Sequence, residues 1–206
     1  MLPLRSKEEV VQEFRIQSIQ DATMRVIARK GMAAATVQEI ADEAGVAKGT
    51  IYLYFRDRDE LIEKTFEGAM AQLMARVDAV LDQDLPFDQK IRETIAAKLA
   101  FFSDNREFFR LYLTLRMPEG PASRQRRKQT CHPQYRARAK KLAGVLKQAM
   151  DRGEIREVDP YRLALFIMEG STAVILERLT EDSSPADAAD VELMAGLVLD
   201  GIRKRE

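Results

Sequence analysis

Apolar residues recur along most of this chain every three to four positions, as on one face of a helix, and few stretches alternate as a strand does. The first predicted helix contains Ile16, Ile19, Val26 and Ile27. We expect it to end at Gly31 in the left-handed conformation. Helix-forming residues such as Ala, Leu, Glu and Lys are frequent throughout. The pattern predicts an all-α chain of nine helices.

Start and stop signals place the other eight helices. Thr36 with Glu39, and Asp57 with Glu60, have the spacing of capping boxes. Asp159-Pro160 combines a capping residue with a proline at the first helical position. The helices after the first are predicted at about 36–44, 48–54, 57–85, 87–103 and 106–117, then one ending near 150, then 159–180 and, after a break at 183–185, 186–203.

Two prolines and a glycine predict a loop over Pro118–Ser123. Around it, Arg116–Lys141 holds nine Lys and Arg residues and a single acidic residue. Such a run is either a second nucleic-acid contact or a solvated loop and helix face, and we favour the solvated surface for 124–141. Cys131 and His132 are expected to lie in an exposed loop there.

Composition narrows the class of protein. The chain has 206 residues, 46% hydrophobic and 32% charged, as in a folded globular protein of one or two domains. With 33 basic and 33 acidic residues, net charge neither indicates nor excludes a nucleic-acid partner. One Cys and one His leave few groups for a metal site or for catalysis, so neither an enzyme nor a metal is expected. We find no signal-peptide or membrane-spanning run, and expect a cytoplasmic protein.

Residues Thr36–Phe55 form the pattern helix, glycine turn, short helix, which is that of a helix-turn-helix. Such a unit places its second helix in the DNA major groove. Its predicted interior residues are Ile40, Ala41, Ala44, Val46, Ile51 and Phe55. Its predicted open side carries Lys48, Gly49, Thr50, Tyr52 and Tyr54. A lysine suits phosphate contact, and Thr50 and Tyr52 are best placed to read bases. The same pattern also fits a compact helical corner with both tyrosines buried, or an adaptor that binds another protein.

The segment Ile16–Phe66, and above all GMAAATVQEIADEAGVAKGTIYLYFRDRDELI, resembles the N-terminal DNA-binding domain of the TetR family of bacterial transcriptional regulators. Two positions depart from the family pattern, Ala47 where Ser is frequent and Ile27 where Phe is usual. The resemblance implies a DNA-binding domain at 10–56. It implies that DNA is contacted by Thr36, Lys48, Gly49, Thr50, Tyr52 and Tyr54, with Arg58 clamping a phosphate.

The remainder, 57–206, is expected to form a helical effector-binding and dimerisation domain. The segments at about 159–180 and 186–203 are apolar on more than one face, so each needs cover on a second side. Either they pair inside a monomer or, as the resemblance implies, they form the interface of a homodimer. A two-fold dimer would meet successive major grooves of a palindromic operator in double-stranded DNA.

The resemblance also implies a small organic effector that releases a repressor from DNA, with no cofactor and no membrane. Methionine and aromatic residues suit an adaptable pocket as a group, although ordinary core is the favoured explanation for any one of them alone. Glu169 interrupts an apolar run and is exposed, paired with Arg110 or Arg116, or aimed at a ligand. The predicted pocket residues are Phe66, Met70, Met74, Phe102, Phe109, Tyr112 and Glu169.

Overall fold

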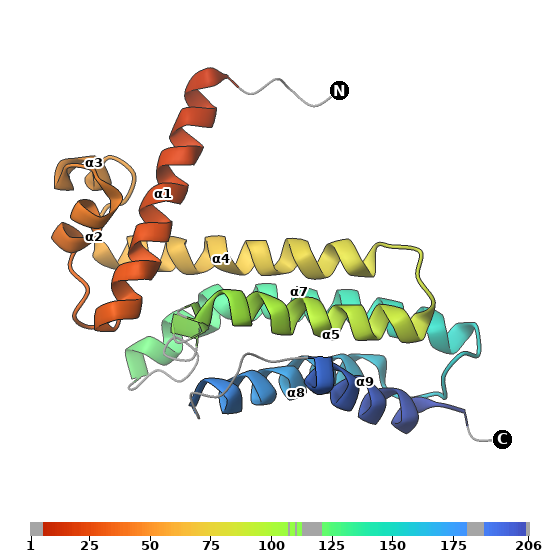
Figure 1. The fold of residues 1–206 in the computed structure, drawn as a ribbon. Helices are drawn as coiled ribbons and strands as arrows, with labels where there is room; N and C mark the ends of the chain where they lie inside the picture. Colours follow the sequence, from red (N-terminus) through yellow and green to blue (C-terminus); the bar gives the residue numbers. More distant parts are fainter. Residues whose placement is uncertain (1–5, 107, 110, 113–120, 181–187, 205–206) are drawn as a thin grey trace. The chain divides into compact units, whose positions relative to one another are not determined.

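The computed structural model describes residues 6–106, 108–109, 111–112, 121–180 and 188–204, with the backbone alone at 121–134 and 179–180 (Figure 1). Every regular element among them is an α-helix, which confirms the predicted all-α class. The helices are α1 (Lys7–Lys30), α2 (Val37–Ala44), α3 (Lys48–Tyr52), α4 (Arg58–Leu81), α5 (Phe87–Asp104), α7 (Pro121–Asp151), α8 (Pro160–Thr180) and α9 (Ala188–Ile202).

Within the described residues eight helices have defined bounds, one fewer than the nine predicted. The difference concerns the helix predicted at 106–117. Residues 106, 108, 109, 111 and 112 are helical, whereas 107, 110 and 113–117 lie outside the described residues. The predicted break at 183–185 also lies outside them.

The chain divides into two compact units. The first unit comprises Met1–Gln72 and Glu107–Thr114, and the second comprises Leu73–Arg106 and Leu115–Glu206. Helix α4 belongs to both, since the division falls between Gln72 and Leu73. The functional domain boundary predicted from the sequence, between residues 56 and 57, stays a prediction.

In the first unit α1 packs on α2, and α2 packs on α3. The predicted interior of the corner is confirmed for Ile40, Ala41, Ile51 and Phe55, which are buried, while Ala44 and Val46 are half-buried. The core is completed by Ile19, Ala22 and Val26 of α1 and by Leu61 and Ile62 of α4.

Helix α1 begins nine residues before the first apolar position that predicted it. Ser6 caps it: the Ser6 hydroxyl accepts from the Glu9 N–H at 3.1 Å, and the Ser6 N–H donates to the Glu9 carboxylate at 2.7 Å. The apolar residues of the early turns, Val10, Val11 and Phe14, are all exposed, so this part of α1 has no buried face. Gly31 has φ 79° and ψ 159°, so its expected left-handed helical conformation was wrong, although its φ is positive.

In the second unit α7 packs on α8, and α5 packs on both α8 and α9 (Figure 1). Asp159 starts α8 as predicted: its carboxylate accepts from the N–H groups of Tyr161 and Arg162, each at 2.9 Å, and Pro160 is the first helical residue. Proline fits there because its missing N–H would have no partner within the helix.

Helix α7 corrects two expectations. It begins at Pro121, so the predicted loop was wrong over 121–123, and 118–120 lie outside the described residues. The second proline starts a helix rather than breaking one. Cys131 and His132 lie within α7, not in a loop. Among the basic residues whose side chains are described, Arg136 and Lys140 are exposed, whereas Arg138 and Lys141 are half-buried. The solvated surface expected over 124–141 therefore stays a prediction.

Candidate DNA-binding site

The turn between α2 and α3 fixes the angle of the short helix. Gly45 ends α2 in the left-handed conformation, with φ 68° and ψ 31°, and the Val46 N–H donates to the Ala41 carbonyl at 3.0 Å. Helix α3 has only five residues, and Ala47 gives it no side-chain cap. Packing must therefore hold it in place, through the buried side chain of Ile51.

The face of α3 opposite Ile51 is open. Lys48 and Gly49 are exposed, Tyr52 is 47% exposed and Thr50 is half-buried. Helix α3 ends at Tyr52, two residues before its predicted end. The Lys48 ammonium, the Thr50 hydroxyl and the Tyr52 phenol thus lie on the same short helix as Gly49, which has no side chain to cover the backbone. A helix that presents such groups can contact both phosphates and base edges.

Leu53 belongs to the same surface, although sequence reasoning did not single it out. Its side chain is 80% exposed. It lies four residues after Gly49, so the two positions share a face of the helical turn. This four-residue spacing from Gly49 is the sequence signal by which Leu53 can be assigned to the surface. A large exposed apolar side chain there suits contact with a thymine methyl group.

Tyr54 lies toward the start of α1. It is half-buried and, with Leu53, lines a groove of about 390 Å³. The other lining residues are Lys7, Glu8, Val11 and Gln12 of α1. Among the predicted contact residues, Tyr54 is therefore less open to solvent than Tyr52.

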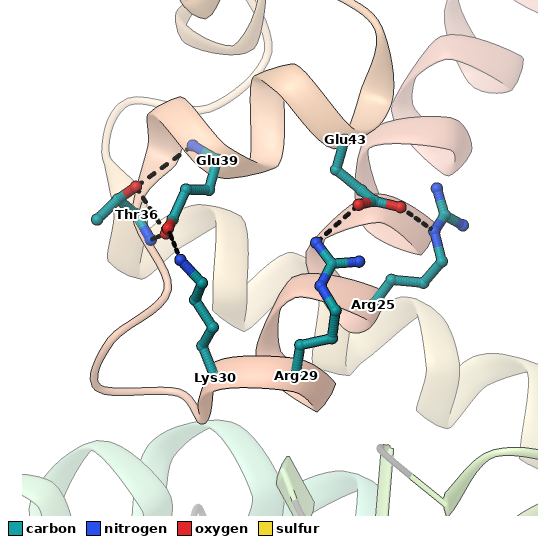
Figure 2. Close-up of polar contacts among 6 residues, drawn as sticks. All are labelled: Arg25, Arg29, Lys30, Thr36, Glu39 and Glu43. Atoms are coloured by element: carbon teal, nitrogen blue, oxygen red, sulfur yellow. Dashed lines mark hydrogen bonds and ion pairs between the residues drawn. The ribbon is translucent and has the colours of Figure 1, made fainter.

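Thr36 caps α2 in the predicted capping box, which Figure 2 shows. Its hydroxyl accepts from the Glu39 N–H at 3.3 Å and lies 2.9 Å from the Glu39 carboxylate, which also accepts from the Thr36 N–H at 3.1 Å. Lys30 of α1 pairs with the same carboxylate. The bonds from Lys30 and then from Thr36 lower the pKa of Glu39 to about 2. Thr36 is exposed, and its hydroxyl is held in one place.

A second carboxylate ties α2 to α1. Glu43 accepts from Arg25 and from Arg29, each at 2.7 Å (Figure 2). These two hydrogen bonds, that from Arg25 foremost, lower the pKa of Glu43. Two successive turns of α2 are thus fixed to α1 by charged hydrogen bonds, which are stronger than neutral ones.

Arg58 is half-buried against the loop that precedes α2. Its Nε donates to the Ala35 carbonyl at 2.6 Å, and a terminal nitrogen donates to the Met32 carbonyl. The structure therefore gives Arg58 a part in holding this loop. Its role as a phosphate clamp stays a prediction.

The structure shows one of the two hydrogen bonds of the capping box predicted at the start of α4. The Asp57 carboxylate accepts from the Glu60 N–H at 2.8 Å, as expected. The Glu60 carboxylate accepts from the Arg56 N–H at 2.6 Å, instead of from the N–H of the capping residue.

The predicted pocket residues are divided between the two units. Phe66, Met70 and Phe109 are buried in the first unit, and Tyr112 is half-buried there. The aromatic rings of Phe66, Phe109 and Tyr112 form one cluster. The ring centroids of Phe66 and Tyr112 are 6.3 Å apart, and those of Phe109 and Tyr112 are 5.8 Å apart. The second unit holds the other three, Met74, Phe102 and Glu169.

Glu169 has a partner that sequence reasoning did not name. It is half-buried, and the Tyr135 hydroxyl donates to its carboxylate at 2.6 Å. The pairings considered from the sequence, with Arg110 or Arg116, fall outside the described residues. Tyr135 lies on α7, far from Glu169 in sequence, so no local pattern could have indicated the pair.

None of the helices that the structure describes is long and apolar enough to cross a membrane. Among the described side chains, no three His, Cys, Asp or Glu residues are grouped so that they could hold a metal ion.

Residues 19–65 match the family model of the bacterial regulatory proteins of the tetR family. An uncharacterised HTH-type transcriptional regulator of Haemophilus influenzae is 38% identical over 37% of this chain, which spans only 41% of that protein. The fatty acid metabolism regulator protein of Bacillus subtilis is 28% identical over 76% of this chain and 79% of its own.

A solved structure extends the likeness to the second unit. The transcriptional regulator FadR from Bacillus subtilis, in complex with stearoyl-CoA, superposes with a TM-score of 0.71, covering 89% of this chain and 95% of that chain at 24% identity. At this identity the likeness concerns the fold. Residues 19–65 thus match the N-terminal domain of the tetR family of bacterial regulatory proteins, and most of the chain shares its fold with FadR.

Proposed function

We propose that this regulator binds a palindromic operator as a dimer, represses transcription and is released by a small organic effector. The observation that carries the proposal is the open face of α3, where Lys48, Gly49, Tyr52 and Leu53 are exposed while Ile51 anchors the helix. We assign DNA binding to residues 10–56 and effector binding with dimerisation to 57–206. Because DNA lies in the bacterial cytoplasm, the protein would act there.

The contact residues divide by chemistry. Lys48 and the Thr36 hydroxyl suit phosphate oxygens, which position a protein without reading sequence. Thr50, Tyr52 and Leu53 can reach base edges or thymine methyl groups. Gly49 lets the helix backbone approach the DNA closely. Tyr54 and Arg58 complete the proposed surface at its edges.

Three exposed apolar side chains support a homodimer through α8 and α9. Phe166 is 64% exposed, Leu193 60% and Leu197 69%, and α8 packs on α9. Leu193 and Leu197 are four residues apart and share one face of α9. Large apolar groups left on one face favour burial against a partner. A two-fold pair would place its reading helices about 34 Å apart, the spacing of successive major grooves.

We propose a fatty acyl compound as the effector. The support is the relative named as a fatty acid metabolism regulator and the similar fold that binds stearoyl-CoA. Helix α4 offers a connection, since it begins beside the reading corner and continues into the second unit. An effector can shift the protein off DNA only if it binds the released conformation more tightly.

Titrating the full-length chain with duplex DNA over a range of salt concentrations tests the function. The duplex should be long enough to cover two successive major grooves. Phosphate contacts predict that log affinity falls linearly with log salt concentration. An adaptor that binds protein, or an enzyme, would show no such binding, and that result would contradict the proposal.

A further inference from the structure

Positive charge is scarce in the reading corner, the segment 36–60 that holds α2, α3 and the start of α4. Its basic residues are Lys48, Arg56 and Arg58. Lys48 is the first residue of α3, whereas both arginines follow the end of that helix at Tyr52. Phosphate contacts fix the orientation of a reading helix on DNA. Within the corner, a charged contact beyond the end of α3 must therefore come from one of the two arginines.

The guanidinium of Arg58 is bound within the protein. Its Nε donates to the Ala35 carbonyl at 2.6 Å, and one terminal nitrogen donates to the Met32 carbonyl. The other terminal nitrogen lies 3.7 Å from the Asp59 carboxylate, and only 32% of the Arg58 side chain is exposed. Each of the three guanidinium nitrogens thus has a partner already, and a phosphate would have to displace one of them.

The guanidinium of Arg56 is open to solvent. The side chain is 81% exposed, and its Nε lies 3.1 Å from the Glu60 carboxylate. The terminal nitrogens of Arg56 bond none of the residues that the structure describes. Paired N–H groups of a guanidinium can bind two phosphate oxygens at once. Arg56 can therefore bind a phosphate through its terminal nitrogens without breaking a bond of the fold.

The backbone of Arg56 is held close to α3. Its N–H donates to the Glu60 carboxylate at 2.6 Å, and the Asp57 carboxylate accepts from the Glu60 N–H at 2.8 Å. Phe55, the preceding residue, is buried, and its N–H donates to the Ile51 carbonyl at 3.0 Å. The Arg56 side chain thus extends from an ordered backbone, which reduces the entropy lost when it binds.

We propose that Arg56, and not Arg58, makes the charged phosphate contact beyond the end of α3, while Lys48 makes the contact at its start. The inference rests on the proposed function, because it takes α3 to bind DNA. Arg58 then acts on DNA binding indirectly, by holding the loop before α2 through the Met32 and Ala35 carbonyls. This assignment differs from the one that the family resemblance implies, in which Arg58 clamps a phosphate.

The salt dependence of duplex binding separates the two arginines. Each phosphate contact adds about one to the slope of log affinity against log salt, whatever the DNA sequence. On the full-length chain and a pool of random-sequence duplexes, Arg56→Gln should lower this slope by about one. It should also weaken binding roughly tenfold near 0.1 M salt. Arg56→Lys keeps the charge and should keep the slope.

Stability should change in the other variant. The bond between Arg56 and Glu60 that orders the turn comes from the backbone N–H, so Arg56→Gln should leave the urea midpoint unchanged. Arg58→Gln removes the two bonds to the loop before α2, so its urea midpoint should fall. Where Arg58→Gln is folded, its salt slope should equal that of the wild type.

Arg152 provides the matched control. Its side chain is also exposed, and its Nε also lies beside a glutamate carboxylate, that of Glu154 at 2.6 Å. Arg152 belongs to the second unit, outside the reading corner. Arg152→Gln removes the same charge from the chain as Arg56→Gln and should leave the slope unchanged. A loss of slope confined to Arg56→Gln would therefore not be an effect of net charge.

The wild type, measured in the same series, separates this inference from the proposed function. A slope lowered in Arg56→Gln, but not in folded Arg58→Gln or in Arg152→Gln, supports the inference. If the wild type binds duplex with a salt slope that Arg56→Gln retains, the inference is overturned and DNA binding stands. A slope lowered in folded Arg58→Gln alone would return the contact to Arg58. If the wild type binds no duplex, the proposed function fails and the inference fails with it.

Discussion

On α3 the proposed phosphate contacts and base contacts come from different side chains, so single substitutions can separate them. We expect Lys48→Ala to weaken binding to every duplex and to lower the slope of log affinity against log salt by about one. Thr50→Ala should instead change which sequences are preferred. Fluorescence anisotropy with several duplexes measures both effects.

The control for Lys48 is Lys64→Ala. Lys64 is also exposed, but it lies on α4 and pairs there with Glu67 at 2.7 Å. Lys64→Ala should leave the slope of log affinity against log salt unchanged. If Lys48→Ala and Thr50→Ala reduced binding equally on all sequences, the division of roles would be wrong.

Glu39 predicts a pH dependence of stability. Its pKa is lowered from 4.5 to about 2 in the folded protein, so the ionised form is favoured by folding. This stabilisation is present above about pH 4.5 and is lost as the pH falls toward 2. Urea unfolding of Glu39→Gln should therefore show a shallower loss of unfolding free energy over this range than wild type.

The exposed carboxylate of Glu93, on α5, serves for comparison. Glu93→Gln should follow the wild-type pH profile. A Glu39→Gln profile that coincided with wild type would show that the bonds to Lys30 and Thr36 add nothing to acid sensitivity.

Much of the reading site could be predicted from residue types alone. Thr36 and Glu39 have fixed spacing in a capping box, and the burial of Ile51 follows from helical periodicity. Arg58 could not be placed in this way, because its bonds to Met32 and Ala35 span 26 and 23 positions of the chain. Side-chain choices among several acceptors depend on tertiary geometry that local patterns do not encode.

At the scale of elements, two glycines of the helix-turn-helix have different roles. Gly45 needs its positive φ, so Gly45→Ala should destabilise the protein by about 1 to 2 kcal/mol even though no atom lies within 4 Å of the added carbon. Gly49 is inside α3 and also has open space, so Gly49→Ala should stabilise by up to about 1 kcal/mol.

Function should move in the opposite direction at Gly49. The added methyl group would stand between α3 and the DNA, so affinity for duplex should fall while stability rises. Urea unfolding and anisotropy on the same samples test this. Unchanged affinity in Gly49→Ala would mean that the backbone does not approach DNA at this position.

Element boundaries were predictable where a side chain caps a helix. Asp159 and Pro160 placed the start of α8 correctly, because the cap needs only neighbouring residues. The apolar stripe from Ile16 to Ile27 does not reach the start of α1, which is marked instead by the capping box of Ser6 and Glu9. The start of α7 is harder to predict, because a proline can begin a helix as well as end one.

At the scale of the whole molecule, the exposed apolar face of α8 and α9 predicts a concentration-dependent dimer. A charge placed there would have to be buried in the interface, so Leu197→Glu should shift the protein to monomer. Phe14→Glu is the control, since Phe14 is also a largely exposed apolar residue, on α1. Analytical ultracentrifugation measures the mass of each. A dimer that survived Leu197→Glu would place the interface elsewhere.

The most direct test of the central claim is selection from a pool of random-sequence duplexes by the full-length wild-type chain, with Lys48→Ala in parallel. The account predicts enrichment of an inverted repeat whose half-sites are centred about ten base pairs, or a multiple of that, apart. It also predicts weaker recovery by Lys48→Ala. Recovery of no preferred sequence by the wild type, or of a single site without a second half, would contradict it.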